Sequence, residues 1–398
     1  MGGETGRRAL DLRARVAKFI DEEVIPLEPL AAAGSLPVDV LHDVRERAKA
    51  AGLWAPQLPP EYGGQGLEIL DACPVFEAAG RSLLGPLALG CAAPDEGNAH
   101  LLVLAATEAQ KEKYLRRLAA GEVRSTFSMT EPAPGAGSDP GMMLTRAKRD
   151  GDGWVIDGRK WFATGASGAA FAIVAAVTEP GVPIEERLTL FIVDAGTPGF
   201  TVVREIPVLG GVTPGGHCEV LLERCRVGAG QVLGEVGKGY ALIQARLGPA
   251  RLTHCMRWLG AAARSLEIAT RRAREREAFG KPLAEHQAVE WMLADSAIEI
   301  HASRLMVADA ASRIARGDAA RAETSMCKVF VAETVGRVID RAIQVCGALG
   351  LTAELPLARF AEEARAFRIY DGPSEVHRMA IARRLLRDAR DGGWKSGS

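Results

Sequence analysis

The sequence predicts an α+β protein, mainly α, that is built from three parts. Its 398 residues exceed what one ordinary core accommodates. Helical periodicity up to about residue 123 gives way to short β-branched segments separated by Gly or Pro, and long helical stretches then return. We therefore expect an N-terminal helical domain (1–123), a middle antiparallel β domain (124–237) and a C-terminal four-helix bundle (238–398).

In the N-terminal part, apolar residues recur at helical spacing and predict two helices. The first is expected to end at Pro26 and Pro29, because proline cannot continue an α-helix, and the second covers about residues 40–51. Thr107-Glu-Ala-Gln110 matches a capping box, so a further helix is expected to begin there and to run to about Ala120.

The middle part carries short apolar segments, as in a sandwich or barrel rather than a parallel sheet with crossover helices. The predicted strands are 154–156, 172–175, 188–193, 200–203 and 219–222. From Gly239 onward, three long apolar stripes and a shorter one after Pro373 predict the four helices of an antiparallel bundle.

Composition excludes several classes of function. A net charge of −1 gives no support for nucleic acid or an anionic membrane as partner. The chain has no apolar leader and no run of 18 apolar residues, so we expect a cytoplasmic protein without membrane insertion. Seven cysteines without a C-x-x-C spacing indicate reduced thiols, and seven histidines without an H-x-x-x-H pair give a metal centre little support.

The generic phosphate-binding and hydrolase patterns fail. Gly135-Ala-Gly137 is followed by Pro140 and opens no helix of a βαβ unit, so it is not a dinucleotide fingerprint. Gly237-Lys-Gly239 lacks the leading glycine and the hydroxyl of a P-loop. Gly165-Ala-Ser-Gly-Ala169 is not a nucleophile elbow. These mismatches argue against nicotinamide, nucleoside triphosphate and serine-hydrolase chemistry.

More specific motifs follow one another in a fixed order. Phe127-Ser-Met-Thr-Glu-Pro-Ala-Pro-Gly-Ala-Gly-Ser-Asp139 resembles the signature of the acyl-CoA dehydrogenase family. Further motifs in the family's order are Glu61-Tyr-Gly-Gly-Gln-Gly66, Gly158-Arg-Lys-Trp-Phe-Ala-Thr164, Arg276-Glu-Ala-Phe-Gly-Lys-Pro-Leu283, His286-Gln287 and Gln344-Val-Cys-Gly347. A branch whose base lies in an Asp-Gly-Pro turn is indicated by Ala93-Pro-Asp-Glu-Gly-Asn98, Gly216-His217, Arg246-Leu-Gly-Pro-Ala-Arg251 and Asp371-Gly-Pro-Ser-Glu-Val-His377.

The resemblance implies FAD as cofactor and assigns residues to it. By analogy, the segment from Phe127 offers backbone groups to the flavin, and Ser138 offers a hydroxyl to the pyrophosphate. The guanidinium of an arginine binds a neighbouring subunit's pyrophosphate through two hydrogen bonds. The implied cofactor residues are Phe127, Met129, Thr130, Ser138, Phe162 (over the flavin ring), Thr164 (at the reactive nitrogen), Arg276, Phe279 (on the neighbour's adenine), Gln287, Gln344 and Gly347. Ser138 and Arg251 are the implied substrate residues.

The implied reaction is α,β-dehydrogenation of an acyl thioester, as in fatty acid β-oxidation. The resemblance makes Asp371 the base that removes the α-proton; Ala250, where some relatives place the base, cannot serve. Taken alone, Asp371 is better explained as a solvated cap of the helix near Ser374, and the flanking motifs reverse that interpretation. The sequence departs from the family pattern at two positions. Asp371 stands where many members have Glu, and Ala348 stands where a second Gly is common.

The resemblance also implies partners. They are an acyl-CoA substrate, an electron-transfer flavoprotein as electron acceptor, and further copies of the chain in a homodimer or homotetramer. Three alternatives remain open: an oxidase of the same fold, a dehydrogenase of carrier-protein-bound thioesters, and a flavin-free binding protein. The sequence sets neither acyl chain length nor branching.

Overall fold

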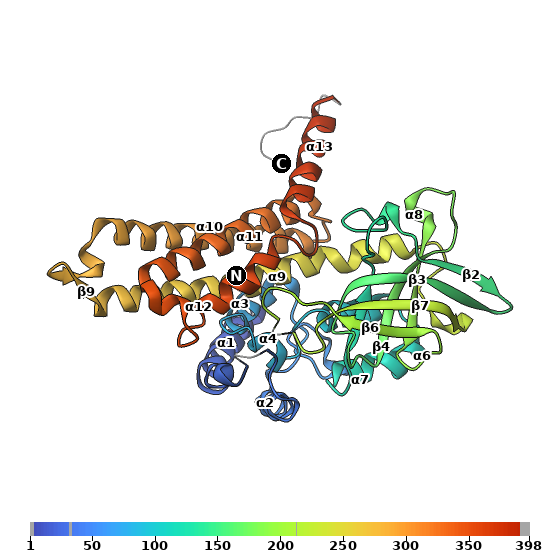
Figure 1. Ribbon diagram of the computed structural model, residues 1–398, viewed down its shortest axis with the longest axis horizontal. Helices are drawn as coiled ribbons and strands as arrows, with labels where there is room; N and C mark the ends of the chain where they lie inside the picture. Colours follow the sequence, from blue (N-terminus) through green and yellow to red (C-terminus); the bar gives the residue numbers. More distant parts are fainter. Residues whose placement is uncertain (1–3, 32–33, 212, 391–398) are drawn as a thin grey trace. The chain divides into compact units, whose positions relative to one another are not determined.

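The computed structural model describes residues 4–31, 34–211 and 213–390. Contacts group the chain into two compact units, one with residues 1–32, 67–86 and 250–398 and the other with residues 33–66 and 87–249. The long helix α9 (Gly239–Glu275) contributes to both, and Figure 1 labels the main elements. None of the helices in the described part of the chain is long and apolar enough to cross a bilayer.

The first unit is helical. Its α-helices are α1 (Glu4–Phe19), α3 (Ile69–Ala79), the C-terminal part of α9, α10 (Gln287–Ala315), α11 (Arg321–Cys346), α12 (Leu357–Phe367) and α13 (Ser374–Arg390). Helix α11 packs against α10, α12 and α13, which explains the unbroken buried stripe along it. A two-stranded hairpin, β9 (Glu277–Ala278) and β10 (Lys281–Pro282), joins α9 to α10. The predicted bundle is confirmed, and α12 is an addition to it.

The prediction that two prolines end the first helix is wrong in one respect. The α-helix ends at Phe19, but helical turns continue through a π-helical segment, η1 (Ile20–Val24), and a 3-10 segment, η2 (Ile25–Ala31). Both prolines lie in η2. Proline removes one N–H and clashes with the carbonyl four residues earlier, which rules out continued α-helix but not a tighter turn.

The second unit combines short helices with a sheet. Its helices are α2 (Val38–Ala50), α5 (Asp95–Ala105), α6 (Glu108–Gln110), the π-helical η4 (Lys111–Leu115), α7 (Arg116–Ala119) and α8 (Ile184–Arg187). The predicted capping box is present: Gln110 N donates to Thr107 Oγ1 at 3.2 Å and Thr107 N donates to Gln110 Oε1 at 2.9 Å. Short turns of this unit are η3 (Pro60–Tyr62), η5 (Pro140–Met142) and η6 (Ala229–Gln231); α4 (Gly85–Ala88) lies at the boundary of the two units, and η7 (Leu283–Glu285) and η8 (Gly347–Leu351) belong to the first unit.

Eight strands form one sheet. They are β1 (Ser125–Ser128), β2 (Arg146–Asp150), β3 (Gly153–Thr164), β4 (Phe171–Val177), β5 (Leu188–Asp194), β6 (Phe200–Glu205), β7 (His217–Val227) and β8 (Val232–Leu233). Their order is β6-β7-β3-β2-β4-β5-β8, with β1 also paired to β4. All five predicted strands are present. Strand β4 is buried along its whole length, because one apolar cluster covers each of its faces.

The sheet differs from the prediction in the two pairings that β4 makes with β1 and β2. Strand β4 runs parallel to β1 and to the end of β2, whereas every other pair in the sheet is antiparallel. A parallel pair needs a crossover connection, and here the hairpin of β2 and β3 serves as that connection between β1 and β4.

Candidate active site

The segment after β1 is fastened to β3 through its carbonyl groups. The Met129 carbonyl accepts a hydrogen bond from Lys160 Nζ at 3.1 Å, and the Thr130 carbonyl accepts one from Trp161 N at 2.8 Å. Two β3 residues therefore fix the course of a segment 30 residues earlier in the chain. Both side chains of the segment, Met129 and Thr130, are half-buried.

Glu131, the next residue, organises the loop that follows. Its buried carboxylate accepts hydrogen bonds from the backbone N–H groups of Leu144 (2.7 Å), Thr145 (2.8 Å) and Ala136 (3.3 Å) and from Lys160 Nζ (2.9 Å). Burial raises the pKa of this carboxyl, but the Lys160 charge and the hydrogen bonds outweigh it and hold the pKa below its usual range. Burial lowers the pKa of Lys160 to about 8.

An arginine covers the ring of Phe127 from the N-terminal part of α9. The Arg246 guanidinium lies 4.2 Å from the ring centroid, and its Nε donates to Asn98 Oδ1 at 3.0 Å. Asn98 in turn donates to Ser125 Oγ at 2.9 Å. Two motifs separated by about 150 residues, at Asn98 and Arg246, thus support the same strand, β1.

Phe162 stands out on β3. It has a positive φ of 53° and 46% of its surface is exposed, at an irregularity in the pairing of β3 with β7 between Lys160 and Ala163. A bulge of this kind re-aims a side chain, and here it exposes an aromatic ring. Two residues on, Thr164 Oγ1 lies 2.9 Å from His217 Nδ1. Ser138 is exposed on the loop after Glu131.

These features fit an aromatic ligand with a polar edge. Phe162 supplies a ring surface, and next to it the buried Trp161 Nε1–H has no acceptor within the described residues. A donor left without a partner costs free energy unless a ligand atom or water accepts from it. The isoalloxazine of FAD carries both the ring and the acceptor atoms that such a surface would bind.

The remaining predicted cofactor residues lie in the helical unit. Arg276 and Phe279 belong to the β9–β10 hairpin, where Phe279 has a φ of 54° and 98% of its surface is exposed. Gln287 begins α10, and Gln344 lies near the end of α11, both exposed. Gly347 ends α11 at φ 63°, a conformation that suits glycine.

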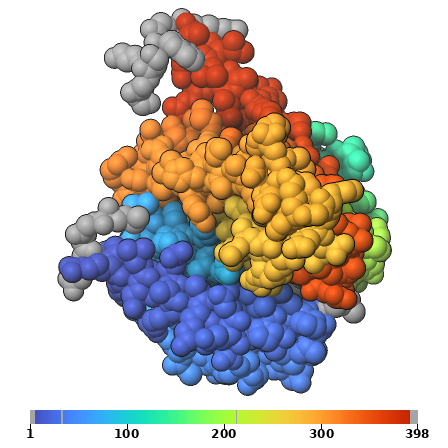
Figure 2. All heavy atoms as spheres, turned by 90° about the vertical axis from the view of Figure 1, so that its left-hand side faces the viewer, coloured from blue at the N-terminus to red at the C-terminus, as the bar shows by residue number. Residues whose placement is uncertain are grey.

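One apolar cluster holds these positions at the same end of the bundle. That cluster contains Ala273 on α9, Leu283 on η7, Val289 at the start of α10, and Val345 and Cys346 on α11. In the space-filling view, the gold atoms of the end of α9, the hairpin and the start of α10 face the viewer (Figure 2). The hairpin is thus a surface feature of the unit that carries it.

Asp371 lies on the turn between α12 and α13 with a φ of 54°, which a non-glycine residue rarely adopts. Its carbonyl accepts hydrogen bonds from Arg251 Nε at 2.9 Å and from the His377 ring at 3.2 Å. Its carboxylate Oδ2 lies 3.2 Å from His254 Nε2. Gly372 leaves room for this arrangement, since a Cβ there would meet His377 Nε2 at 2.6 Å. The side chain is neither on the open surface nor in the core.

The surroundings of this turn hold several buried ionisable groups. Lys328 on α11 is fully buried and donates to the Phe367 carbonyl at 2.6 Å, and burial lowers its pKa. Burial raises the pKa of the Tyr370 phenol. Burial, and then the charge of Arg251, lowers the pKa of His377 to about 4, so this imidazole is neutral at pH 7. Lys328 and Arg251 are thus basic side chains close to this turn.

Comparisons with known proteins agree along the chain. Models of the acyl-CoA dehydrogenase N-terminal, middle and C-terminal domains match residues 7–122, 126–225 and 237–386. The Mycobacterium tuberculosis protein named "Probable acyl-CoA dehydrogenase FadE2" is 42% identical over 394 residues, which cover 95% of each chain. The chain belongs to the acyl-CoA dehydrogenase family.

Solved acyl-CoA dehydrogenase structures share the fold. Butyryl-CoA dehydrogenase from Megasphaera elsdenii superposes with a TM-score of 0.86 at 28% identity, over 97% of this chain and 99% of that one. The PigA structure with FAD and proline gives a TM-score of 0.87 at 25% identity, over 95% and 97% of the two chains. Acyl-CoA dehydrogenase family member 11 of Gallus gallus is 38% identical over 96% of this chain, which spans only 51% of that relative. This acyl-CoA dehydrogenase is an oxidoreductase with FAD as its cofactor.

Sequence reasoning missed part of the surroundings of Asp371. His254 lies one helical turn after Arg251 on α9, and Arg257 and Trp258 follow it on the same face. This i, i+3, i+4 spacing was a signal that could have identified the histidine. Lys328 offered no comparable signal, because it is a single lysine in a long amphipathic helix.

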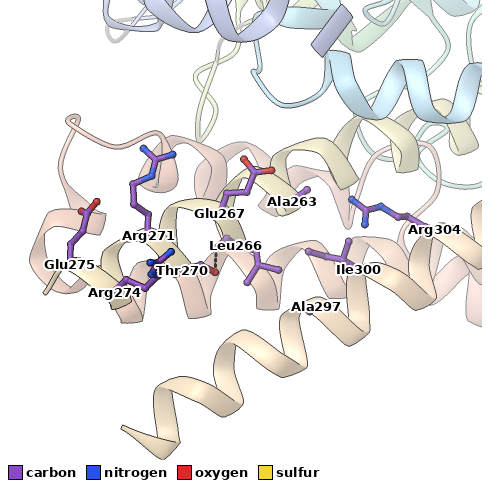
Figure 3. Close-up of a pocket in the computed structure, with 10 residues that line it drawn as sticks. All are labelled: Ala263, Leu266, Glu267, Thr270, Arg271, Arg274, Glu275, Ala297, Ile300 and Arg304. Carbon is purple, nitrogen blue, oxygen red and sulfur yellow. Dashed lines mark hydrogen bonds between the residues drawn. The ribbon is translucent and has the colours of Figure 1, made fainter. Parts of the chain in front are cut away.

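A groove of the helical unit lies elsewhere. It has about 820 Å³ between α9 and α10, and Figure 3 shows Leu266 and Ile300 between the two helices with charged side chains around them. Ala263, its lining residue nearest to His254 along α9, follows that histidine by two and a half turns, roughly 13 Å. The groove is therefore not the site of Asp371.

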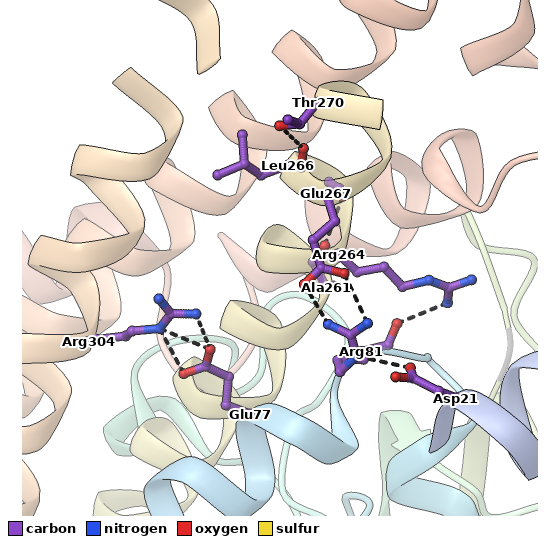
Figure 4. A network of polar contacts seen from close by, with 10 residues as sticks. Asp21, Glu77, Arg81, Ala261, Arg264, Leu266, Glu267, Thr270 and Arg304 are labelled. Carbon is purple, nitrogen blue, oxygen red and sulfur yellow. Dashed lines mark hydrogen bonds and ion pairs between the residues drawn. The ribbon is translucent and has the colours of Figure 1, made fainter. Parts of the chain in front are cut away.

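Ion pairs fasten the helices beside this groove. Arg81, after α3, donates to Glu267 on α9 at 2.7 and 2.9 Å and to Asp21 at 3.1 Å (Figure 4). Arg304 on α10 is paired with Glu77 on α3. Two charged residues that line the groove, Glu267 and Arg304, are thus engaged in structural contacts within the unit.

Proposed function

We propose that this acyl-CoA dehydrogenase oxidises the Cα–Cβ bond of an acyl-CoA thioester to the trans-2-enoyl-CoA, with Asp371 as the base. The observation that carries the proposal is the placement of Asp371, a carboxylate on a positive-φ turn whose carbonyl is fastened by Arg251 and His377. Backbone strain of this kind persists where the surroundings over-determine it, as they commonly do at functional sites.

Different residues of the chain are assigned to proton removal and to flavin binding. Asp371 removes the proton from the α-carbon, and its carboxylate is placed for this on a turn whose backbone Arg251 holds. FAD, when bound, would supply the acceptor for the hydride that leaves the β-carbon. Phe162 would cover the flavin ring, and the Thr164 hydroxyl would face its reactive nitrogen. The reaction requires Asp371 and the flavin on opposite faces of the acyl chain.

The other predicted residues are assigned to binding. We assign Phe127, Met129 and Thr130 to the flavin, and Ser138 to the pyrophosphate and the substrate. Arg251 is assigned to the substrate side as well, although its Nε already donates to the Asp371 carbonyl. Its contribution then includes holding the turn from which the base acts.

We propose that a second copy of the chain covers the hairpin end of the bundle. Phe279 on the hairpin is 98% exposed, and Trp291, Ile298 and Leu305 on α10 are 62%, 65% and 59% exposed. The three α10 residues are seven positions apart, so they form one apolar stripe along one face. Arg276 and Phe279 then reach the other copy's FAD, with Gln287, Gln344 and Gly347 at the adenosine half.

Electron-transfer flavoprotein is the proposed electron acceptor. The structure titled as the electron transferring flavoprotein of Acidaminococcus fermentans matches this chain with a TM-score of 0.85 at 28% identity, over 98% of this chain. An oxidase that passes electrons to oxygen is the second candidate. To distinguish the two candidates, the protein is reduced anaerobically and mixed either with oxygen or with electron-transfer flavoprotein. The rate at which its flavin is reoxidised is followed by absorbance.

The test of the proposed base is Asp371→Asn. The amide is isosteric and sits on a turn, so the variant keeps its fold and its flavin, but it cannot accept the α-proton. A positioned base contributes on the order of 10²–10⁴ in rate. Wild-type and variant are mixed anaerobically with saturated acyl-CoAs of increasing chain length while flavin bleaching is recorded; the same screen gives the preferred chain length.

Glu375→Gln is the matched control, because Glu375 is the next carboxylate along the chain and its side chain is 76% exposed. We expect it to bleach at the wild-type rate. Bleaching of Asp371→Asn at that rate would place the base elsewhere.

A further inference from the structure

His254 lies between Asp371 and an arginine. Its Nε2 is 3.2 Å from Asp371 Oδ2, and its Nδ1 is 3.1 Å from an Nη of Arg257. All three residues belong to the helical unit, with His254 and Arg257 one turn apart on α9 and Asp371 on the turn before α13. The imidazole therefore bridges a guanidinium and the proposed base.

The arginine fixes the tautomer of this imidazole. A guanidinium can only donate hydrogen bonds, so His254 Nδ1 must be the acceptor and carries no proton. The ring proton of the neutral imidazole is then on Nε2, which donates to the Asp371 carboxylate. A proton on Nδ1 would face the Arg257 donor and would exclude this contact.

The imidazole is also held in place by packing. Its centroid lies 4.7 Å from that of Tyr370, and only 14% of the His254 side chain is exposed. The Tyr370 hydroxyl accepts a hydrogen bond from Trp258 Nε1 at 2.6 Å, and Trp258 stacks on Phe367 at 5.8 Å. The donor that faces Asp371 is thus anchored to α9 and to the end of α12.

The backbone of Asp371 is anchored separately. Arg251 and His377 bind its carbonyl, which leaves the rotation of the side chain as the main freedom of the carboxylate. A hydrogen bond to one carboxylate oxygen restricts that rotation and sets the direction of the other oxygen. Contacts to the backbone cannot do this.

We propose that His254, held as the Nε2–H tautomer by Arg257, is a positioning residue that orients the Asp371 carboxylate for proton abstraction. The inference rests on the proposed function, since it gives His254 a role only if Asp371 is the base. His254 itself exchanges no proton with the substrate in this scheme. Its N–H stays hydrogen-bonded to Oδ2 while the carboxylate takes up the α-proton.

The tautomer gives a test that depends on geometry. In His254→Gln, the side-chain amide can place an N–H where the imidazole Nε2–H lies. Asn is one methylene shorter and cannot, and Ala has no donor. We expect flavin reduction by acyl-CoA to slow on the order of 10²-fold in His254→Ala and His254→Asn, the size of effect that a misplaced reacting group causes, and to stay within a few-fold of wild-type in His254→Gln.

The measurement separates chemistry from binding. Reduction is followed anaerobically with the acyl-CoA that bleaches the wild-type flavin fastest, and binding by titrating the corresponding enoyl-CoA against the flavin spectrum. Loss of rate with unchanged binding and flavin content supports orientation. His42→Gln, an exposed histidine on α2, is the control and should behave as wild-type.

Three outcomes would decide against the inference or its basis. Full-rate reduction by His254→Ala overturns it, and so does a His254→Gln variant as slow as His254→Asn, because a merely structural role shows no preference for the donor position. If His254→Ala does not fold, the comparison of the flavin reduction rates of His254→Gln and His254→Asn still tests the inference. Asp371→Asn is measured alongside to separate the two proposals. If its flavin bleaches at the wild-type rate, Asp371 is not the base. If its flavin does not bleach but that of His254→Ala bleaches at the wild-type rate, only the role of His254 is refuted.

Discussion

The ammonium of Lys160 and the carboxylate of Glu131 lie 2.9 Å apart, and both side chains are buried. The pair joins β3 to the loop after β1, two segments to which the proposed cofactor residues Thr130, Ser138 and Phe162 also belong. Because Glu131 also binds three backbone N–H groups of that loop, the pair determines the shape of the proposed flavin-binding surface.

Lys160→Met should destabilise the protein by about 3–5 kcal/mol, because it leaves the Glu131 charge buried without its partner. The change is measured as the free energy of unfolding in urea. Lys113→Met is the matched control: Lys113 pairs with Asp194 at 2.9 Å, but both side chains are exposed, so its loss should cost no more than about 1 kcal/mol. Equal effects of the two substitutions would refute the distinction.

Stability should fall as the pH decreases from about 6.5 to 4. His377 has its pKa lowered from 6.5 to about 4 by burial, so in this window the unfolded chain binds a proton that the folded chain does not. The free energy of unfolding therefore drops by roughly 1–3 kcal/mol through this group. Urea unfolding at several pH values measures it. His377→Asn should flatten the dependence, whereas exposed His42→Asn should leave it unchanged.

Arg276→Ala should weaken FAD retention by roughly 1.5–3 kcal/mol, since a charge-assisted contact to pyrophosphate is lost. Fluorescence of released flavin during dialysis reports this. Arg13→Ala, an exposed arginine on α1, is the control and should retain FAD as wild-type does. Unchanged retention in Arg276→Ala would remove the arginine from the cofactor site.

Ile298→Glu should dissociate the assembly without unfolding the chain. The side chain is 65% exposed within one chain, so a charge there is solvated in the monomer but lies in the apolar stripe of the proposed contact. Sedimentation shows the mass, and circular dichroism shows the retained helix. Leu104→Glu, at an exposed leucine of α5, should stay assembled. A wild-type protein that is monomeric with bound FAD would contradict the proposed contact.

Local patterns predicted what local forces determine. The capping box at Thr107 and Gln110 was readable because its two hydrogen bonds join residues three apart. The apolar stripe from Val289 to Ile314 predicted α10 for the same reason, since helical neighbours recur at a fixed period. Pro26 and Pro29 were misjudged, because the rule that excludes α-helix says nothing of a 3-10 turn.

Contacts between distant residues were not predictable in this way. Lys160 and Glu131 are 29 residues apart on different segments, and no periodicity marks them as partners. His254 and Asp371 are separated by most of the bundle. The resemblance supplied Asp371 as a candidate, but the side chain that fixes the orientation of its carboxylate became visible only in the folded chain.

The backbone conformation of Asp371 bears on which acid can stand there. At a φ of 54°, asparagine and aspartate are the residues other than glycine that best tolerate the strain, because their short side chains can bond to nearby backbone groups. Glutamate has no such compensation. A turn of this shape therefore selects the shorter acid, and the substitution Asp371→Glu would demand a different loop as well as a longer side chain.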